Sequence, residues 1–383
     1  MESSTPREDG PEKWPWRLRW IAWRNSVLAN PRFQDWAARN WLTRRVARRK
    51  ARELFDLVAG FTYTQVLLAM VESGLLELLG QGPSTLAQIM ERTGLNEAAA
   101  ARLVKASASL GLAQEAVPGM WMLGQRGAAL LSQEGAKAML RHHPLLYRDL
   151  TDPLVLLKQD RTTPTELSEF WRYAARAQAD AEGSEAVGPY SQLMAASQAM
   201  VAREVLRAFP FERYAALLDV GGGHGAFVSH VAAQHQRLRL GVFDLPGVVE
   251  GAAVRLAALG VAERVALHGG DFFRDPLPQG FDCISLVRIL HDHDDEPAQR
   301  LLGAIRNALP PGGALLIAEP MAGTPGAEAM GEAYFGMYLW AMRSGRPRTA
   351  DEIGAMLGRA KFARWRELPT AQPLIARVIV ALA

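Results

Sequence analysis

Cysteine is nearly absent from this chain of 383 residues, which contains only Cys283. One cysteine excludes a disulfide framework, and a reducing compartment is then the expected environment, so we expect a cytoplasmic protein. Cys283 lies in an apolar segment that is typical of a buried strand. A small core residue is the favoured interpretation of this thiol, and a reactive thiol is the alternative.

Long apolar runs are missing as well. The longest such stretch, Val66 to Val71, is interrupted at Glu72, so the sequence predicts no membrane-spanning helix. The first dozen residues are polar, and no apolar segment with a small-residue cleavage site follows them, so we expect no signal peptide. Hydrophobic residues still make up 49% of the chain, which is enough for two domains with cores of their own.

Acidic residues are scarce near the N-terminus. Residues 1–52 hold thirteen Lys or Arg and five Asp or Glu, a local charge of +8 in a chain whose net charge is +3. Six of the ten tryptophans fall within residues 13–52, among twelve basic residues. Indole rings and guanidinium groups suit an anionic membrane interface. Residues 13–52 are therefore expected either to contact a membrane peripherally or to pack on a partner subunit, and the sequence leaves both open; nucleic acid is not favoured.

The most informative stretch is LLDVGGGHGA, residues 217–226. Its apolar part predicts a buried strand, and its glycines predict a tight turn into a helix that begins near Phe227. The amides of a helix N-terminus can then face a ligand. Because Gly221, Gly223 and Ala226 also satisfy the pattern G-x-G-x-x-G/A, this stretch alone leaves the kind of nucleotide open, a nicotinamide dinucleotide included.

Four further apolar segments predict strands: 239–243, 265–268, 282–286 and 314–318. Helical segments alternate with them, which indicates an α/β fold with a parallel sheet whose ligands lie at the carboxyl ends of the strands. An acid at the tip of the second strand can hold a ribose diol. The third strand ends in an acid and an aromatic residue, which can bind and cover an adenine. The candidate site residues at these ends are Asp244, Asp271, Phe272, His291 and Glu319.

Taken together, DVGGGHG, FDLPGVV, GDFF, RILHDHDDE and LLIAEP resemble the small-molecule O-methyltransferases that use S-adenosylmethionine. The resemblance covers roughly residues 50–383. It implies a Rossmann-like methyltransferase domain behind a mostly helical winged-helix dimerisation domain, and hence a homodimer. The implied division is an arm at 1–52, a dimerisation and substrate domain at 53–188, and the methyltransferase domain at 189–383.

The resemblance also implies a role for each candidate residue. His291 would be the general base, with Glu319 beside it, since a histidine can accept a proton near neutral pH. The cofactor, S-adenosylmethionine, would be bound by Asp219, Gly221, Gly223, Gly225, Asp244, Asp271 and Phe272. The substrate would be contacted by Tyr190, Met194 and Asp292.

Two positions depart from the pattern of the family's plant members. Pro347, within GRPRT, stands where those members carry a second glutamate next to the histidine, so carboxylates on both sides of His291 are not expected. His293 replaces the usual tryptophan after the His-Asp pair. A metal site made of His291, His293 and Asp294 is not favoured, because consecutive side chains on a helix do not share a face, and we expect no metal.

The region after the arm is predicted to be helical. Residues 52–79 show apolar side chains at helical spacing and predict one or two buried helices. Ser84 and Asn96 are predicted to cap the two helices that follow, and an apolar hairpin completes a winged helix. A DNA-binding regulator is therefore an alternative function. The second helix offers only Arg102 and Lys105 to a DNA phosphate backbone, so a dimerisation element is favoured.

The arm and the run ARELFDLVAGFTYTQVLL most resemble the carotenoid O-methyltransferases of purple phototrophic bacteria, of the hydroxyneurosporene or demethylspheroidene type. That resemblance implies methylation of a tertiary hydroxyl at the end of a long polyene, with contact to the inner membrane. A chlorophyll-type pigment or another small hydroxylated molecule is the alternative substrate. The aromatic and Met-rich segment 330–342 would suit an apolar substrate if it lines the pocket. A nicotinamide oxidoreductase would share the first two motifs, but Asp271 and Phe272 would have no role in such an enzyme.

Overall fold

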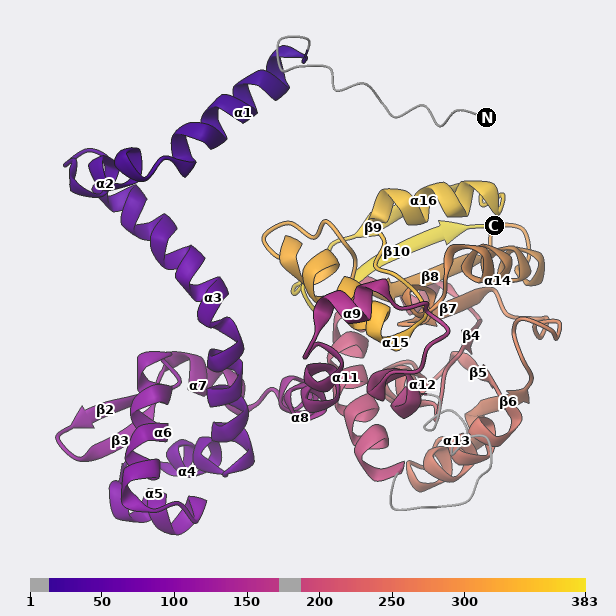
Figure 1. Ribbon diagram of the computed structural model, residues 1–383. Coiled ribbons are helices and arrows are strands. Elements are labelled where there is room, and N and C mark those ends of the chain that lie inside the picture. The colour runs from indigo at the N-terminus through magenta and orange to yellow at the C-terminus, as the bar shows by residue number, and fades with distance from the viewer. Residues whose placement is uncertain (1–13, 172–186) are drawn as a thin grey trace. The chain divides into compact units, whose positions relative to one another are not determined.

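The structure is a computed structural model that describes residues 14–171 and 187–383, with the backbone alone at residues 187–196. The chain divides into two compact units, residues 1–128 and 129–383 (Figure 1). The division falls before α8 (Glu134–Asp149), because α8 packs on α11 (Val187–Ala208) of the second unit. The domain boundary near residue 188, predicted from composition, lies within α11; the division into arm, dimerisation domain and methyltransferase domain stays a prediction.

The first unit is mostly helical. Its small sheet has the order β1-β3-β2, and the strands are β1 (Ser84–Thr85), β3 (Met120–Leu123) and β2 (Ala113–Val117). The helices are α1 (Trp16–Ala29), α2 (Pro31–Arg39), α3 (Arg44–Glu72), α4 (Leu75–Gln81), α5 (Leu86–Thr93) and α6 (Glu97–Ser109), and α7 (Gln125–Leu131) follows the hairpin. The two helices and the hairpin expected for a winged helix are thus present.

The N-caps show one error in the sequence prediction. Thr85, not Ser84, caps α5: its hydroxyl accepts from the amide of Gln88, whose side chain accepts in return from the amide of Thr85. This capping box satisfies two amides that the helix leaves unpaired. Ser84 lies instead in β1. Asn96 caps α6 as predicted, accepting from the amide of Ala99.

The prediction of buried helices over residues 52–79 holds for α4, which buries Leu75, Leu76 and Leu79, but is wrong for most of α3. Burial within α3 begins only at Met70, near its C-terminal end. Helical spacing identifies an apolar face but not the chain that covers it, and here the face is uncovered within the unit. The large exposed apolar side chains of this face are Leu54, Phe55, Leu57, Val58 and Phe61.

Helix α3 is longer and more apolar than the prediction of no membrane-spanning helix assumed. Within the described ranges it is the one helix that is long and apolar enough to cross a bilayer, judged by length and composition alone. The helix contains no long unbroken apolar run, because neutral residues such as Gly60 and Thr62 separate the apolar ones without ending the helix.

The second unit contains a seven-stranded sheet in the order β6-β5-β4-β7-β8-β10-β9. The first five of these strands are parallel, and β10 is antiparallel to β8 and β9. The strands are β4 (Ala216–Val220), β5 (Arg239–Asp244), β6 (Val265–Gly269), β7 (Cys283–Val287), β8 (Ala314–Glu319), β9 (Arg364–Leu368) and β10 (Arg377–Leu382). All five predicted strands are confirmed, with the Rossmann-like class of the fold.

Helices cover both faces of this sheet (Figure 1). One core forms beneath α11, α12 (Ala226–Gln234) and α13 (Pro246–Ala258), and the other beneath α14 (Asp295–Ala308) and α16 (Ala350–Arg359). Coverage on both faces explains why β4, β7 and β8 are apolar almost throughout. Cys283 is fully buried in β7, and burial raises the pKa of its thiol far above the usual range, so it is a core residue rather than a reactive thiol.

Candidate active site

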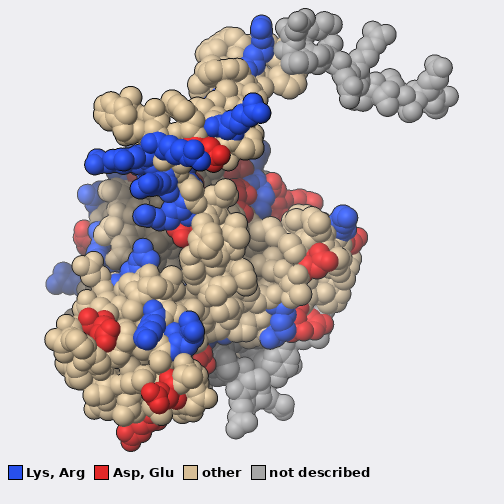
Figure 2. Space-filling view, turned by 60° about the vertical axis from the view of Figure 1, so that its left-hand side comes forward, with Lys and Arg blue, Asp and Glu red and all other residues tan. Residues whose placement is uncertain are grey.

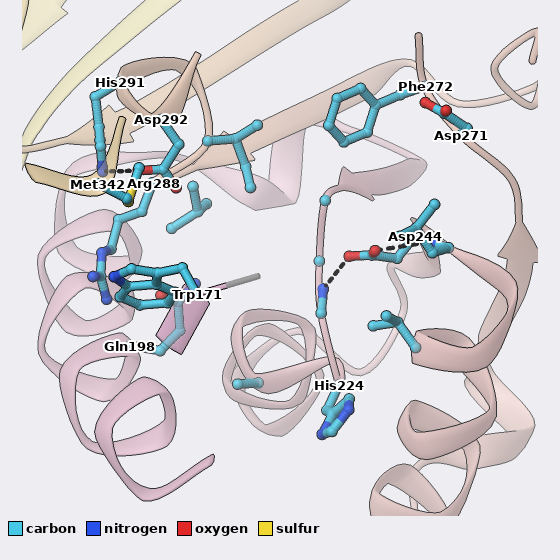
Figure 3. A pocket seen from close by; sticks show the side chains of 18 of the residues that line it. Trp171, Gln198, His224, Asp244, Asp271, Phe272, Arg288, His291, Asp292 and Met342 are labelled. Carbon is cyan, nitrogen blue, oxygen red and sulfur yellow. Dashed lines mark hydrogen bonds and ion pairs between the residues drawn. The ribbon is translucent and has the colours of Figure 1, made fainter. Parts of the chain in front are cut away.

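A cavity of about 440 Å³ opens at the carboxyl ends of the parallel strands in the second unit (Figure 3). Its lining includes most of the residues predicted for the site. Figure 3 shows them on two sides, with His291 and Asp292 at one side and Asp244 and Phe272 at the other. The predicted residues in the lining are Gly221, Gly223, Asp244, Asp271, Phe272, His291 and Asp292.

The turn after β4 is built on glycines at left-handed backbone angles. Gly221 has a φ of 71° and Gly223 a φ of 57°, a region that side chains disfavour. At Gly221 an added Cβ would lie 2.6 Å from the Ile289 side chain, so packing requires glycine there. Gly223 lines the cavity, and an added Cβ there would meet no atom within 4 Å. Gly223 therefore keeps space open for a ligand.

Asp244, at the end of β5, closes the other side of this turn. Its carboxylate accepts hydrogen bonds from the amides of Gly223 and Leu245, both at 2.8 Å. Burial raises the pKa of this carboxyl group, although the two amides oppose the shift. A carboxylate has about four lone-pair sites, so Asp244 can still accept from the hydroxyls of a ligand.

Asp271 and Phe272 follow β6 and line the same side of the cavity. The Asp271 carboxylate accepts from the amide of Phe273 at 2.8 Å, which holds the turn in place. The Phe272 ring packs edge-on against the ring of His293, the residue that replaces the usual tryptophan. The pair offers an acceptor and an aromatic face to one ligand group.

Asp219 is not in the cavity wall. It is buried in β4, where the Ser285 hydroxyl donates to it at 2.6 Å, and burial raises its pKa to about 7. Gly225 and Glu319 are likewise not lining residues, since Gly225 is the N-cap of α12 and Glu319 lies behind His291. These three predicted site residues therefore support others that reach the cavity.

His291 is held between two carboxylates. Its Nδ1 lies 3.2 Å from Oε2 of Glu319. Its Nε2 lies 3.1 Å from Oδ1 of Asp292, the contact drawn in Figure 3. The expectation that Pro347 would leave His291 supported on one side only is wrong, because Asp292 supplies the second carboxylate. Burial lowers the pKa of His291, but Asp292 and Glu319 outweigh it and raise the pKa to about 10. The imidazole is therefore protonated at neutral pH in this arrangement.

Arg288 and Trp171 are among the cavity residues that were not identified from the sequence. Arg288 follows β7 at a left-handed φ of 60°, a strained angle for a non-glycine residue, and donates to the Ser197 hydroxyl at 2.7 Å. Trp171 donates from Nε1 to the Tyr338 hydroxyl at 3.0 Å. Arg288 is the first residue of RILHDHDDE, so this motif could have indicated a cation near the histidine. Trp171 lies in a region without a motif.

The segment 330–342 forms an apolar wall, as its composition suggested. It consists of a π-helical turn, Met330–Gly336, and α15 (Met337–Met342). The wider π turn re-aims side chains within a helix and is frequent at functional sites. Tyr190 and Met194, also predicted to contact substrate, have side chains outside the described residues. The wall residues in the cavity lining are Phe335, Tyr338, Leu339 and Met342.

A fully buried arginine fixes the loop that carries His291. The Arg348 guanidinium donates to the carbonyls of Leu290 and His293, each at 2.8 Å, and pairs with Asp295 at 2.7 Å. These bonds bracket His291 in the chain. Arg348 is therefore a positioning residue that acts through the loop.

We expect Arg348→Ala to lower the free energy of unfolding by about 3 kcal/mol or more, because it leaves buried carbonyls unpaired. The control is Arg346→Ala, which removes half-exposed ion pairs with Asp295 and Glu352 and should cost about 1 kcal/mol or less. Thermal and urea unfolding of both variants measure the difference. Equal losses would mean that Arg348 does not fix this loop.

Comparison with known proteins decides the family. The sequence profile of the O-methyltransferase domain matches residues 147–363, more than half of the chain. The chain belongs to the O-methyltransferase family. A second profile, of the O-methyltransferase dimerisation domain, matches residues 55–133 and supports assembly of this enzyme as a homodimer.

Two similar relatives of this O-methyltransferase are named demethylspheroidene O-methyltransferase. The protein of Cereibacter sphaeroides is 42% identical over 93% of both chains. That of Rhodobacter capsulatus is 44% identical, over 89% of this chain and 84% of its own. Among solved structures, CalO1, a methyltransferase in calicheamicin biosynthesis in its S-adenosylhomocysteine-bound form, is 26% identical with a TM-score of 0.72, and covers 87% of this chain and 98% of its own.

The O-methyltransferase uses S-adenosylmethionine as its cofactor, as the family and its solved structures indicate. The nicotinamide oxidoreductase and the DNA-binding regulator, both open from the sequence, are set aside by this assignment. The cavity fits the cofactor: Gly223 leaves space at the turn, and carboxylates stand at the tips of β5 and β6.

Proposed function

We propose that this O-methyltransferase methylates the tertiary hydroxyl at the end of an acyclic carotenoid, of the demethylspheroidene or hydroxyneurosporene type. The observation that carries the proposal is the identity of 42% and 44%, over most of the chain, to two relatives that carry the demethylspheroidene name. The apolar wall of Phe335, Leu339 and Met342 is consistent with a polyene end. Methylation of a chlorophyll-type pigment is the competing proposal.

The cavity size supports a division of space between cofactor and substrate. At about 440 Å³ it lies toward the small end of ligand sites, which span roughly 300–1,000 Å³. A cofactor and the reacting end of a substrate use this volume, so most of a long polyene stays outside it. An enzyme that takes only the end of an apolar chain can act while the rest remains in a membrane.

We propose the following cofactor contacts. Asp271 and Phe272 bind the adenine, Asp244 accepts from the ribose hydroxyls, and the turn at Gly221 and Gly223 faces the methionine part. The two sides of the cavity in Figure 3 support this order, because it directs the reactive end toward His291. Asp219 and Gly225 hold the turn from behind, as their burial and capping indicate.

The bound cofactor supplies a methyl group on a sulfonium, and the protein must align the acceptor oxygen and remove its proton. We propose that the neutral form of His291 accepts this proton at Nε2, with Asp292 displaced from that nitrogen. Glu319 holds Nδ1 and so fixes the ring. In the structure the Asp292 carboxylate contacts Nε2 of His291. The substrate hydroxyl is proposed to replace it there, and Asp292 then contacts the hydroxyl as well. Tyr190 and Met194 are proposed to line the substrate path.

We further propose how the enzyme is assembled and where it acts. A second copy covers the exposed face of α3 that begins the dimerisation domain, Leu54 to Phe61, since apolar patches of this kind mark protein interfaces. The enzyme is otherwise cytoplasmic and meets its substrate at the surface of the inner membrane. Residues 13–52 make the peripheral contact.

Pigment profiling tests the proposed substrate. Cells that make the hydroxylated carotenoid but lack this gene product should accumulate the free alcohol, and supplying the protein should convert it to the methyl ether. Supplying the His291→Ala variant is the control and should leave the alcohol. Unchanged carotenoids together with an altered chlorophyll-type pigment would replace this proposal by the competing one.

The pKa of His291 makes a prediction about pH. If neutral His291 is the base, kcat/KM should rise about tenfold per pH unit below its pKa of about 10. Asp292→Asn removes a charge that raises this pKa, so the rise should level off at a lower pH. Rate profiles of both proteins measure the shift. Loss of activity at every pH in Asp292→Asn would instead make Asp292 the proton acceptor.

A further inference from the structure

The first two helices are unusual for their exposed tryptophans. None of the 14 residues of α1 is buried. Trp16, Trp20 and Trp23 follow the helical spacing i, i+4, i+7 and so share one face, with exposed fractions of 76%, 51% and 63%. Trp36 in α2 and Trp41 after it are also more than half exposed. A soluble surface rarely leaves this much indole in water.

Guanidinium groups flank the tryptophan stripe of α1. At 100° per residue, Arg19 lies on one side of the stripe, and Arg17 and Arg24 lie on the other. The Arg24 guanidinium stands 5.3 Å from the centre of the Trp20 ring. Such a pair places a cation at the edge of an aromatic surface, where it can meet an anionic headgroup while the indole enters the interface.

The start of α3 adds a second group of positive charges. Arg44, Arg48 and Arg52 share one face at spacing i, i+4, i+8, and Arg45 is adjacent. Among the residues that the structure describes, these four form no ion pair with an acid, unlike Arg49 and Lys50, which pair with Glu53. Figure 2 shows Lys and Arg side chains gathered in the upper part of the view.

The occupant of this surface follows from its chemistry. Residues 14–52 carry eleven Arg or Lys and a single acid, Asp35. The matches to the dimerisation and methyltransferase profiles begin only at residue 55, so the arm lies outside the part that the family shares. A surface of indole and unpaired guanidinium complements an anionic lipid headgroup layer, where each basic residue and each tryptophan is stabilised.

We propose that residues 14–52 form a peripheral binding surface for anionic membranes, with the Trp16–Trp20–Trp23 stripe in the headgroup layer and the arginines of α3 on lipid phosphates. This inference deepens the proposed function, because it names the lipid chemistry from which the enzyme takes its substrate. The attachment is electrostatic and interfacial, and α3 does not cross the bilayer.

Flotation of the full-length enzyme with vesicles tests the surface. One set contains equal phosphatidylcholine and phosphatidylglycerol, and the other phosphatidylcholine alone. We expect binding to the anionic set, release by high salt because screening weakens headgroup attraction, and little binding to the neutral set. Binding that resists salt would overturn the peripheral attachment and indicate insertion of α3, and equal binding to both sets would overturn the role of lipid charge.

Paired variants then assign the residues. Arg45→Gln with Arg48→Gln should weaken partitioning on the order of twenty-fivefold, about fivefold per charge lost. The control, Arg102→Gln with Lys105→Gln, removes two exposed charges from α6 and should change little. Likewise, replacing Trp16, Trp20 and Trp23 by serine should strongly weaken binding, whereas Leu18→Ser with Ile21→Ser, on the opposite face, should not. Equal effects of variant and control would overturn the proposed surface.

Vesicle binding and carotenoid methylation test the membrane surface and the proposed substrate independently. Vesicle binding is measured without carotenoid, and the same variants should retain the rate of wild type on a detergent-dispersed carotenoid. Vesicle binding without methylation of any carotenoid would contradict the proposed function and leave the surface in place. If the tryptophan variant instead dissociates the homodimer, the arm packs on the second copy and the membrane proposal is wrong.

Discussion

Turnover by His291→Ala is expected to fall roughly a hundredfold or more, the scale of a lost general base. Its imidazole is the basic group in the cavity held by carboxylates on both nitrogens, Glu319 at 3.2 Å and Asp292 at 3.1 Å. The substitution removes the proton acceptor but leaves the turn at Gly223 and the carboxylate of Asp244 untouched. Affinity for S-adenosylmethionine should therefore change little, which steady-state kinetics and cofactor titration together measure.

A matched control for this variant is His230→Ala. His230 lies on α12 in the same unit and is not among the residues that line the cavity. Its loss should leave turnover near that of wild type. If turnover of His291→Ala stays within a few fold of wild type, His291 only positions the substrate, and the proton leaves by another route.

Cofactor binding is expected to be lost in Gly223→Val, with the fold retained. Gly223 lines the cavity, and an added Cβ there meets no protein atom within 4 Å, so we expect a valine side chain to take up space that the methionine part of the cofactor needs. The substitution also strains the backbone, because Gly223 has a φ of 57°. Calorimetric titration with S-adenosylhomocysteine measures the loss of binding.

Gly260→Val is the control for the backbone strain that Gly223→Val introduces. Gly260 has a φ of 69° and equally open surroundings, but it lies in the turn after α13 and does not line the cavity. Both variants should lose similar stability, and only Gly223→Val should lose the cofactor. Normal cofactor titration by a folded Gly223→Val protein would remove the proposed cofactor position.

The methyltransferase fold was largely predictable because its determinants are local. Parallel strands buried on both faces are apolar throughout and end abruptly in glycine or acid, so β4, β5 and β8 could be located with the residues at their tips. Since such tips meet at one edge of the sheet, Asp244 and His291 could be placed in one site without knowledge of the helices.

What could not be predicted depends on contacts made in three dimensions. The second carboxylate on His291 comes from its neighbour Asp292, through the 3₁₀ turn at residues 290–292 and a side-chain conformation that no motif encodes. Asp219 belongs to the same motif as the glycines, but its side chain accepts a hydrogen bond from Ser285 and does not line the cavity. The apolar period of α3 predicts a buried face, but a period does not reveal which molecule covers that face, and here it is exposed within the unit.

The most direct measurement of the central claim supplies the purified full-length enzyme with S-adenosylmethionine labelled in its methyl group and with an acyclic carotenoid that carries a terminal tertiary hydroxyl. Mass spectrometry and NMR then locate the label. We predict a labelled methyl ether at that hydroxyl, formed in equal amount with S-adenosylhomocysteine. A label that never reaches the carotenoid, while a chlorophyll-type pigment offered to the same active enzyme becomes labelled, would contradict it.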